Sequence, residues 1–329
     1  MAVHVGINSN TKKQISSMYI GVDGNKKEVI TAYANKNGTV AKVYANKPKG
    51  QKIFTTSGTF TIPDRVTSVD IFLVGGGGAG GASCLTNNYY NNSNAPYYSN
   101  GHGGGGGYTK TVKGVSVTPG KSYSIVVGAG AASQSNDSPA LTRGGDSSGL
   151  GYSVGGGFSG YNNYESGDIT NSAGGGSGGG KGGYSCEKVI WTGFSAGGAG
   201  GDNGSNGWKG STGSDPSKYQ LSTSTKVCVG QGTTTRAFGE SSGSFYSGGG
   251  AGASAYVHEK YKPNGGYPGG GDGSCRWEVW SGTGWTNNNS WARTATKGDH
   301  GTGGGGGGAW IHEASGAGGS GCVIIRWGY

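Results

Sequence analysis

Runs of consecutive glycine recur along most of this sequence, and they constrain its fold more than any other feature. The glycine-rich stretches are residues 75–81, 103–107, 155–160, 174–183, 197–204, 248–252, 265–273, 301–308 and 316–321. Glycine loses more conformational freedom on ordering than any other residue, so such a run is a poor α-helix or β-strand. Because it lacks a Cβ atom, however, two glycine backbones can touch along their length. Either the runs are disordered, or backbone packs against backbone.

Composition favours the ordered alternative. Glycine supplies 77 of the 329 residues, about three times its usual share of roughly 7%. The hydrophobic fraction of 32% is too low to fill a side-chain core from end to end. Disordered segments are poor in aromatic residues, whereas this chain has 19 Tyr and 8 Trp. Collagen needs glycine at every third position and abundant proline, and the chain has only 8 Pro. We therefore expect ordered glycine runs that do not form collagen.

An extended helix with three residues per turn and about 3.1 Å of rise per residue suits such runs. It has no internal hydrogen bonds, so its N–H and C=O groups point outward and can pair with neighbouring helices, assisted by weak Cα–H···O contacts. This arrangement satisfies the backbone without large side chains. The sequence predicts an all-β or irregular fold in which bundled polyglycine II helices are capped by β-strands, with no significant α-helix.

Short strands are predicted at both ends of the glycine-rich region. The stretch Lys52–Ile62 alternates in polarity and is interrupted by a turn at Ser57-Gly58, and a second turn is expected at Pro63-Asp64. Val69–Val74 has the length and apolar character of a buried strand. A strand pair is expected at 114–117 and 122–127 around a turn at 118–121, and an apolar strand at Cys322–Trp327. These strands predict one sheet-capped base that holds the glycine runs.

The first 46 residues contain a repeat with a period of 14. Val5–Ile15 aligns with Tyr19–Val29 and more weakly with Tyr33–Val43. The last two copies are centred on Asp23-Gly24 and Asn37-Gly38, which are preferred two-residue hairpin turns. We therefore expect residues 1–51 to form a β-hairpin docking segment with a polar linker, and residues 52–329 to form the glycine-rich domain.

Positive charge is concentrated in that leader. Residues 1–52 contain nine Lys against two acidic residues, a charge of +7, whereas the rest of the chain contributes only +2 of the total of +9. Such a leader could neutralise phosphates or another anionic surface. The alternative is a solvated lysine face that protects the edges of a small sheet. We favour the latter, because no Arg-rich run or aromatic platform accompanies the lysines, and we expect no nucleic-acid partner.

Enzyme, metal and membrane functions find little support. Gly75-x-Gly77-x-x-Gly80 matches the dinucleotide fingerprint, but neither a helix nor the required acidic residue follows it. The five His and the five Cys are scattered, without metal-ligand spacing. No apolar stretch approaches the length of a membrane helix, and the N-terminus has no signal-peptide core. We expect a non-enzymatic protein without cofactor or membrane insertion, made in a bacterial cytoplasm and released by lysis or as part of a particle.

The motifs at the two ends of the glycine-rich region carry a family resemblance. Phe54–Asp64, followed by Val69–Gly78 and closed by Gly318–Trp327, resembles the glycine-rich domains of phage and prophage tail proteins over about residues 52–329. The lysine-rich leader also looks like that of phage structural proteins, often from Gram-positive hosts. The resemblance implies an architecture similar to tail-fibre adhesins whose tip is a sandwich of polyglycine II helices with receptor-reading loops. The sequence departs from them in lacking a coiled-coil or β-helical shaft.

Four aromatic-rich segments between the glycine runs are the candidate receptor-binding loops, namely 87–100, 161–168, 184–194 and 275–293. Tyr and Trp offer rigid amphipathic contact area, and Asn and Ser add adaptable hydrogen bonds, a mixture that suits a glycan or a surface protein. The alternative is that these aromatic residues cover the ends and flanks of the bundle. The candidate residues are Tyr89, Tyr90, Tyr97, Tyr98, Tyr161, Tyr164, Trp191, Trp277, Trp280, Trp285, Trp291 and Arg293.

Three functions follow from these observations. The first is a fibre or tip protein of a phage tail or tail-like particle, which binds a host cell-surface glycan or protein and attaches through residues 1–51 to other tail or baseplate proteins. The second is a purely structural, self-assembling particle component without receptor binding. The third is an ice-binding protein. Trimers are common among tail fibres, so a homotrimer is one of the open assembly states; the expected location is the virion or a tail-like particle.

Overall fold

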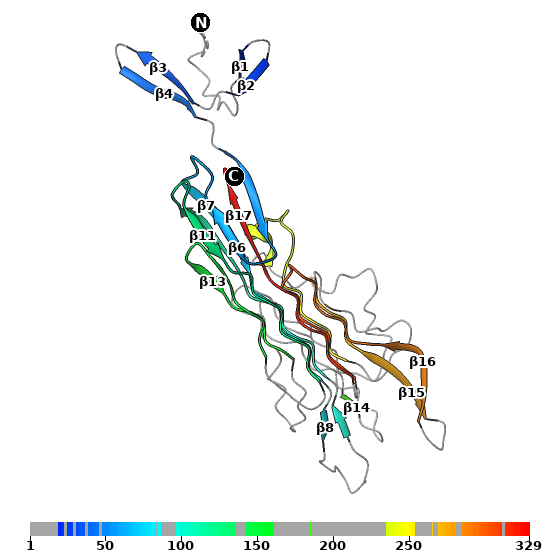
Figure 1. Ribbon diagram of the computed structural model, residues 1–329. Coiled ribbons are helices and arrows are strands. Elements are labelled where there is room, and N and C mark those ends of the chain that lie inside the picture. Colours follow the sequence, from blue (N-terminus) through cyan, green and yellow to red (C-terminus); the bar gives the residue numbers. More distant parts are fainter. Residues whose placement is uncertain are drawn as a thin grey trace.

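A sandwich of short β-strands forms one end of the domain in the computed structural model, and extended glycine-rich segments run side by side from it along the length of the domain (Figure 1). The structure describes residues 19–22, 25–28, 31–36, 39–45, 48–82, 84–86, 97–99, 101–135, 142–160, 184–185, 235–253, 265, 269–280, 285–310 and 313–329. These residues contain strands and one 3₁₀ turn, η3 (Ala237–Gly239), and no α-helix. The predicted all-β or irregular class is confirmed.

The base is built around a four-stranded antiparallel sheet in the order β10-β7-β17-β5. Its strands are β5 (Gly50–Phe54), β7 (Ser68–Val74), β10 (Thr109–Ser116) and β17 (Cys322–Trp327). A second sheet pairs β6 (Gly58–Thr61) with β11 (Ser122–Ile125), and β12 (Ser147–Gly149) pairs with β13 (Tyr152–Val154). The strands predicted within 52–62 and at 69–74 and 322–327 are therefore confirmed, as is the sheet-capped base.

Strand β7 lies at the centre of this base and is covered on both faces. Ile71 and Leu73 belong to a core between the sheets, and Phe72 and Val74 belong to a smaller cluster on the opposite face with Phe238. Burial on both faces explains why β7 is an almost continuous apolar run instead of an alternating one. Trp327, Phe60 and Phe54 extend the main core through ring contacts.

The predicted strand pair around residues 118–121 is wrong in its partners. The turn exists, since Lys121 N–H donates to Thr118 O, but β10 pairs with β7, whereas β11 pairs with β6. The turn thus carries the chain from one sheet to the other. Hydrogen bonds from Gly120 N to Ile62 O and from Ile62 N to Lys121 O attach it to the end of β6. Alternation of polarity marks strands, but it does not identify the partner of a strand.

Two hairpins precede the base and lie beyond its end, next to the C-terminus (Figure 1). β1 (Tyr19–Val22) pairs with β2 (Asn25–Glu28), and β3 (Thr31–Lys36) pairs with β4 (Thr39–Ala45). The innermost pairs, Val22↔Asn25 and Lys36↔Thr39, leave two residues between the strands, as predicted for Asp23-Gly24 and Asn37-Gly38. The first copy of the repeat, Val5–Ile15, lies outside the described residues.

Six strands of the base connect directly to glycine-rich segments. β7 leads into 75–81, β11 into 128–134 and β13 into 155–160, while 101–108, 142–146 and 316–321 lead into β10, β12 and β17. The sandwich therefore sets the starting positions of these segments in the bundle.

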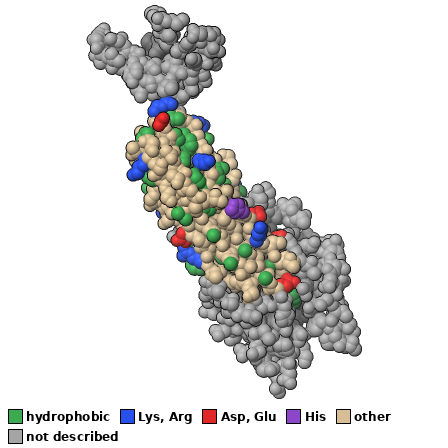
Figure 2. Space-filling model, viewed as in Figure 1, with side chains coloured by type: hydrophobic (Ala, Val, Ile, Leu, Met, Phe, Trp, Pro, Cys, Tyr) green, Lys and Arg blue, Asp and Glu red, His purple; other side chains and the backbone are tan. Residues whose placement is uncertain are grey.

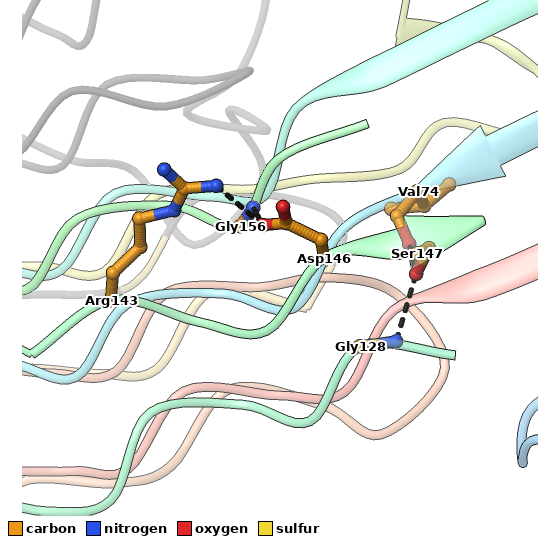
Figure 3. A network of polar contacts seen from close by, with 6 residues as sticks. All are labelled: Val74, Gly128, Arg143, Asp146, Ser147 and Gly156. Carbon is orange, nitrogen blue, oxygen red and sulfur yellow. Dashed lines mark hydrogen bonds and ion pairs between the residues drawn. The ribbon is translucent and has the colours of Figure 1, made fainter. Parts of the chain in front are cut away.

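Polar side chains complete the hydrogen bonding where sheet gives way to bundle (Figure 3). The buried Ser147 hydroxyl donates to Val74 O at 2.6 Å and accepts from Gly128 N–H at 2.9 Å. The carboxylate of Asp146 accepts from Gly156 N–H at 3.2 Å. These contacts pair backbone groups that have left the strand ladders, and unpaired buried groups of this kind would be destabilising.

The hydrogen bonds of the bundle repeat every third residue. In segment 75–81, every third N–H donates to the same neighbouring segment; the pairs are Gly75 to Tyr108 O, Gly78 to Gly105 O and Gly81 to His102 O. Gly77 and Gly80 likewise donate to Gly319 O and Gly316 O of another neighbour. Successive donors that point to different neighbours and return after three residues are the pattern of a helix with three residues per turn. The predicted polyglycine II packing is confirmed for these segments.

Two segments are surrounded on all sides, and we call them the inner segments. Residues 75–81 hydrogen bond to six neighbours, namely segments 101–108, 128–131, 142–145, 155–160, 303–309 and 316–319. Residues 303–309 also have six, namely 75–81, 101–107, 248–251, 271–274, residue 296 and 316–320. Every residue of both inner segments is buried. Their sequences are almost pure glycine, with Ala79 and Ala309 as the exceptions.

Close approach explains that purity. A Cβ atom placed on Gly77 would lie 2.0 Å from Gly304 O, and one on Gly80 would lie 1.9 Å from Gly307 O. Both contacts are to backbone, which cannot move aside as a flexible side chain would. The interior of the bundle is therefore backbone against backbone, as predicted. The predicted runs 174–183 and 197–204 lie outside the described residues.

Segments at the surface of the bundle show the same period in their burial. Along 128–135, Gly128, Ala131 and Gln134 are buried, whereas the positions between them are exposed or partly exposed. Ala131 N–H donates to Gly77 O, and Gln134 N–H donates to Ser315 Oγ. One residue in three thus faces the bundle, and the other two are free to carry side chains.

Candidate functional site

The described parts of three predicted receptor-reading segments, 87–100, 184–194 and 275–293, lie at the end of the bundle farthest from the base, which we call the loop end (Figure 1). Here β9 (Tyr97–Ser99) pairs with both β8 (Cys84–Thr86) and β14 (Tyr184–Ser185). Tyr97 stands opposite Thr86, and Tyr98 stands opposite Leu85 and Ser185. Two of the candidate tyrosines therefore lie on the central strand of a small sheet. Parts of 87–100 and 184–194 are strands where loops were predicted.

The segment 275–293, predicted as a loop, is instead an antiparallel hairpin. β15 (Cys275–Trp280) pairs with β16 (Trp285–Arg293), and four residues connect them. Trp280 stands opposite Trp285, and Trp277 opposite Asn288. The remaining candidates of this segment also lie on β16, Trp291 within the strand and Arg293 opposite Cys275. The expectation of a loop rested on the position of the segment between two glycine runs and is wrong. Its Trp and Val residues favour strands.

The other candidates are Tyr89, Tyr90, Tyr161, Tyr164 and Trp191, and these residues lie outside the described ranges. The described backbone brings Trp277, Trp280, Trp285 and Trp291 together in one hairpin and places Tyr97 and Tyr98 together on another strand.

The loop end is tied to the ends of the two inner segments. Ala309 N–H donates to Gly81 O, and Gly101 N–H, just after β9, donates to Ala309 O. Ser274, just before β15, donates its N–H to Gly308 O and accepts a hydrogen bond from Trp310 N–H at its hydroxyl. The most buried part of the bundle therefore anchors β9 and the β15–β16 hairpin. Rigid anchoring of this kind lowers the entropy lost when a loop binds a partner.

Trp310 contributes to this anchor and was not among the predicted candidates. Only 3% of its surface is exposed, at the position where the glycine run 303–308 ends. A large residue at the end of a pure glycine run is the signal that marks the boundary of the bundle in the sequence.

A second group of large side chains lies on the flank of the bundle, and sequence reasoning missed it. Phe158 is 44% exposed, and the Arg143 guanidinium lies 5.7 Å from its ring centroid. Arg143 also forms an ion pair with Asp146, three residues along the chain (Figure 3). With three residues per turn, positions i and i+3 share a face, so Arg143 and Asp146 project from one side of their segment. That period is the signal that could have found them.

The shifted pKa values belong to the base and not to the loop end. Arg326 donates to Asp70 at 3.1 Å and to Glu240 at 2.7 Å, and it lies 3.9 Å from the ring centroid of Phe238. Its hydrogen bond lowers the pKa of Glu240, and the same bond raises the pKa of Arg326. This cluster attaches the η3 turn to the outer face of the sheet, which is a structural role.

Burial raises the pKa of two further groups near the η3 turn. It raises the pKa of Cys322 to about 12 and that of Tyr246 to about 12. Neither group is an activated nucleophile or base, because a reactive cysteine has a lowered pKa and an accessible sulfur. Within the described part of the chain, no cluster of three or more His, Cys, Asp or Glu could hold a metal ion. No helix in that part has the length and apolarity required to cross a bilayer.

The fold and the loop end together define a class of all-β proteins in which a backbone-packed glycine bundle carries short aromatic strands at one end. A family model described as a glycine-rich domain matches residues 55–328, and the chain belongs to that family. No curated protein matches the chain.

Proposed function

We propose that the chain is a fibre or tip protein of a phage tail or tail-like particle, and that its loop end binds a receptor on the host cell surface. The observation that carries the proposal is the separation of the two ends. The hairpins β1–β4 and the C-terminus lie beside the base, whereas β9 and the β15–β16 hairpin lie at the far end (Figure 1). A protein that is attached through one end can present the other to a cell.

The chemistry of the loop end supports this proposal. Six of the candidate aromatic residues lie on β9, β15 and β16, and the strands are anchored to the inner segments. Aromatic residues on rigid elements provide contact area at a low entropic cost. Such a surface suits a glycan or a cell-surface protein. No catalytic chemistry is part of the proposal.

Substitution of Trp280 and Trp285 by alanine tests the proposal, because these residues stand opposite each other in the hairpin. We expect the purified variant to lose binding to the bacterial strains, within a panel, that the unaltered chain binds. Phe158→Ser is the matched control, since it removes an exposed aromatic residue from the flank instead. Unchanged binding by the Trp280→Ala/Trp285→Ala variant, with an unchanged thermal unfolding transition, would refute the proposal.

A single observation, the small residues on an outward face of the bundle, favours both of the other functions. The outward positions of segment 128–135 are small residues, including Ala129, Gly130, Ala132 and Ser133. Such a face would allow bundles to pack side by side in a purely structural component, and a flat face of small residues is also expected of an ice-binding protein. Sedimentation of the purified chain would detect self-association. A thermal-hysteresis measurement would detect ice binding.

A further inference from the structure

Charge is distributed unequally between the two ends of the molecule. Among the described residues, the hairpins β1–β4 and the base have 12 basic and 4 acidic residues, a charge of +8. The described residues of the bundle and the loop end have 4 basic and 5 acidic residues, a charge of −1. The excess of positive charge in the described part of the chain therefore belongs to one end, which we call the basic end.

The base contributes to this charge as well as the leader. Five lysines of the base are exposed, namely Lys49, Lys52, Lys110, Lys113 and Lys121. Of the three carboxylates in the base segments, Asp70 and Glu240 form ion pairs with Arg326, whose side chain is only 8% exposed. The buried Arg326 thus forms ion pairs with two of the three acidic residues of the base segments, and the third is Asp64. Figure 2 shows Lys and Arg side chains around the base on the visible face.

Large apolar side chains are exposed among these lysines. Ile53 on the edge strand β5 is 51% exposed, and Tyr329 is 65% exposed. The Lys49 ammonium lies 4.0 Å from the centroid of the Tyr329 ring. Apolar and aromatic groups surrounded by charged ones are the usual anatomy of a protein–protein interface.

We propose that the basic end is a docking surface for an acidic protein of the particle. This inference rests on the proposed function, because it takes the loop end as the end that faces the host. Opposite charge accelerates association and sets the orientation of docking, so the charge difference would seat the basic end on the particle and leave the loop end free.

A protein fits the basic end better than a nucleic acid does. The exposed cations around the base are mainly lysines, whereas base recognition relies on arginine forks and on aromatic rings free to stack. Here the aromatic rings already lie beside cations, with Lys110 at 5.8 Å from the Tyr152 ring centroid and Lys121 at 5.1 Å from that of Tyr123.

Binding of the full chain to immobilised poly-L-glutamate tests the proposal, with duplex DNA and anionic phospholipid vesicles as comparison probes. We expect Lys49→Glu/Lys52→Glu to lower the affinity for polyglutamate about tenfold at low salt, and the difference to shrink as salt screens the charges. The control Ala132→Glu/Ser133→Glu/Lys297→Glu changes the net charge by the same amount on exposed positions of the bundle. It should bind almost as the unaltered chain does.

An equal loss in the control variant would overturn the proposal, since net charge alone would then explain binding. Tighter binding to DNA or to vesicles than to polyglutamate would also overturn it, because the partner would not be a protein. Should the double glutamate variant fail to fold, Lys49→Gln/Lys52→Gln removes the same charges more mildly and must still weaken binding. Cell binding by the loop end is a separate measurement, so failure of the docking surface is distinguishable from failure of the receptor-binding proposal.

Discussion

The base and the bundle both have a buried interior, but side chains fill the interior of the base and backbone fills that of the bundle. In the base, Ile71, Leu73 and their neighbours fill the space between sheets with side chains. In the bundle, segments 75–81 and 303–309 are as fully buried as that core, yet they have almost no side chains. A side-chain core tolerates exchange among residues of similar volume. The glycine positions of a backbone core have no such tolerance, because even a Cβ atom there would overlap a neighbouring backbone.

The largest expected effect follows from that difference. Gly77→Ala adds one carbon at a point where it would lie 2.0 Å from Gly304 O, between the two inner segments. We expect this variant to unfold or to lose more than about 4 kcal/mol of unfolding free energy, a loss reserved for severe core defects. Denaturant unfolding followed by tryptophan fluorescence would measure it.

Gly58→Ala is the matched control. A Cβ atom at Gly58 in β6 would meet only carbon atoms of the Phe54 ring, at 3.8 and 3.9 Å. We expect its unfolding free energy to change by less than about 1 kcal/mol. Equal stability of the two variants would break the comparison, because the inner segments would then have room for side chains.

A smaller loss is expected from the side-chain core. Ile71→Ala removes atoms from a residue with 0% exposure, and such truncations cost about 2–5 kcal/mol. Ile53→Ala in the same sheet removes the same atoms from a residue that is 51% exposed, and should cost less than about 1 kcal/mol. Because β7 continues directly into segment 75–81, we expect Ile71→Ala to weaken amide-exchange protection of Gly75–Gly81 as well. Undiminished protection there would mean that the base and the bundle unfold separately.

Much of this comparison could be predicted from the sequence. Short apolar runs located β7 and β17, and the absence of side chains in the glycine runs implied backbone packing. The order of neighbours could not be predicted, because a glycine has no side chain that would select one neighbouring segment over another. Purity in glycine does not identify the inner segments either, because 103–107 is all glycine but hydrogen bonds to fewer neighbouring segments than 75–81 does.

The site was less predictable than the fold. The candidate tryptophans of 275–293 do lie together, but in a hairpin whose strands contain Asn287, Asn288 and Asn289, residues that are typical of loops. The predicted period of three places Arg143 and Asp146 on one face of their segment, but which face is directed away from the bundle becomes evident only from the hydrogen bonds between segments.

A change of pH should affect the base more than the bundle. Burial raises the pKa of Cys322 from 9.0 and that of Tyr246 from 10.0, each to about 12. Both groups favour the neutral form when folded, so their contribution to stability is complete below pH 9 and is lost as the pH rises toward 12. We therefore expect the denaturant midpoint to fall across this range.

The double variant Cys322→Ala/Tyr246→Phe removes both titrating groups and should flatten that decline. A decline of the same steepness in the double variant would assign the alkaline sensitivity to other groups.

The smallest effect is expected at the surface of the bundle, where the period of three separates tolerant from intolerant positions. Ala132 is exposed, whereas its neighbour Ala131 is buried and donates its N–H to Gly77 O. Ala132→Lys should change the unfolding free energy by less than about 0.5 kcal/mol, as is usual for surface substitutions. Ala131→Lys would force a charged side chain into the bundle and should be severely destabilising.

Both positions are alanines and are adjacent in one segment, so only the period of three distinguishes them. Similar losses of unfolding free energy at both positions would contradict the period of three residues per turn. The expected contrast would extend to the outer segments the rule found for the inner ones. A side chain is tolerated wherever the turn directs it away from a neighbouring backbone.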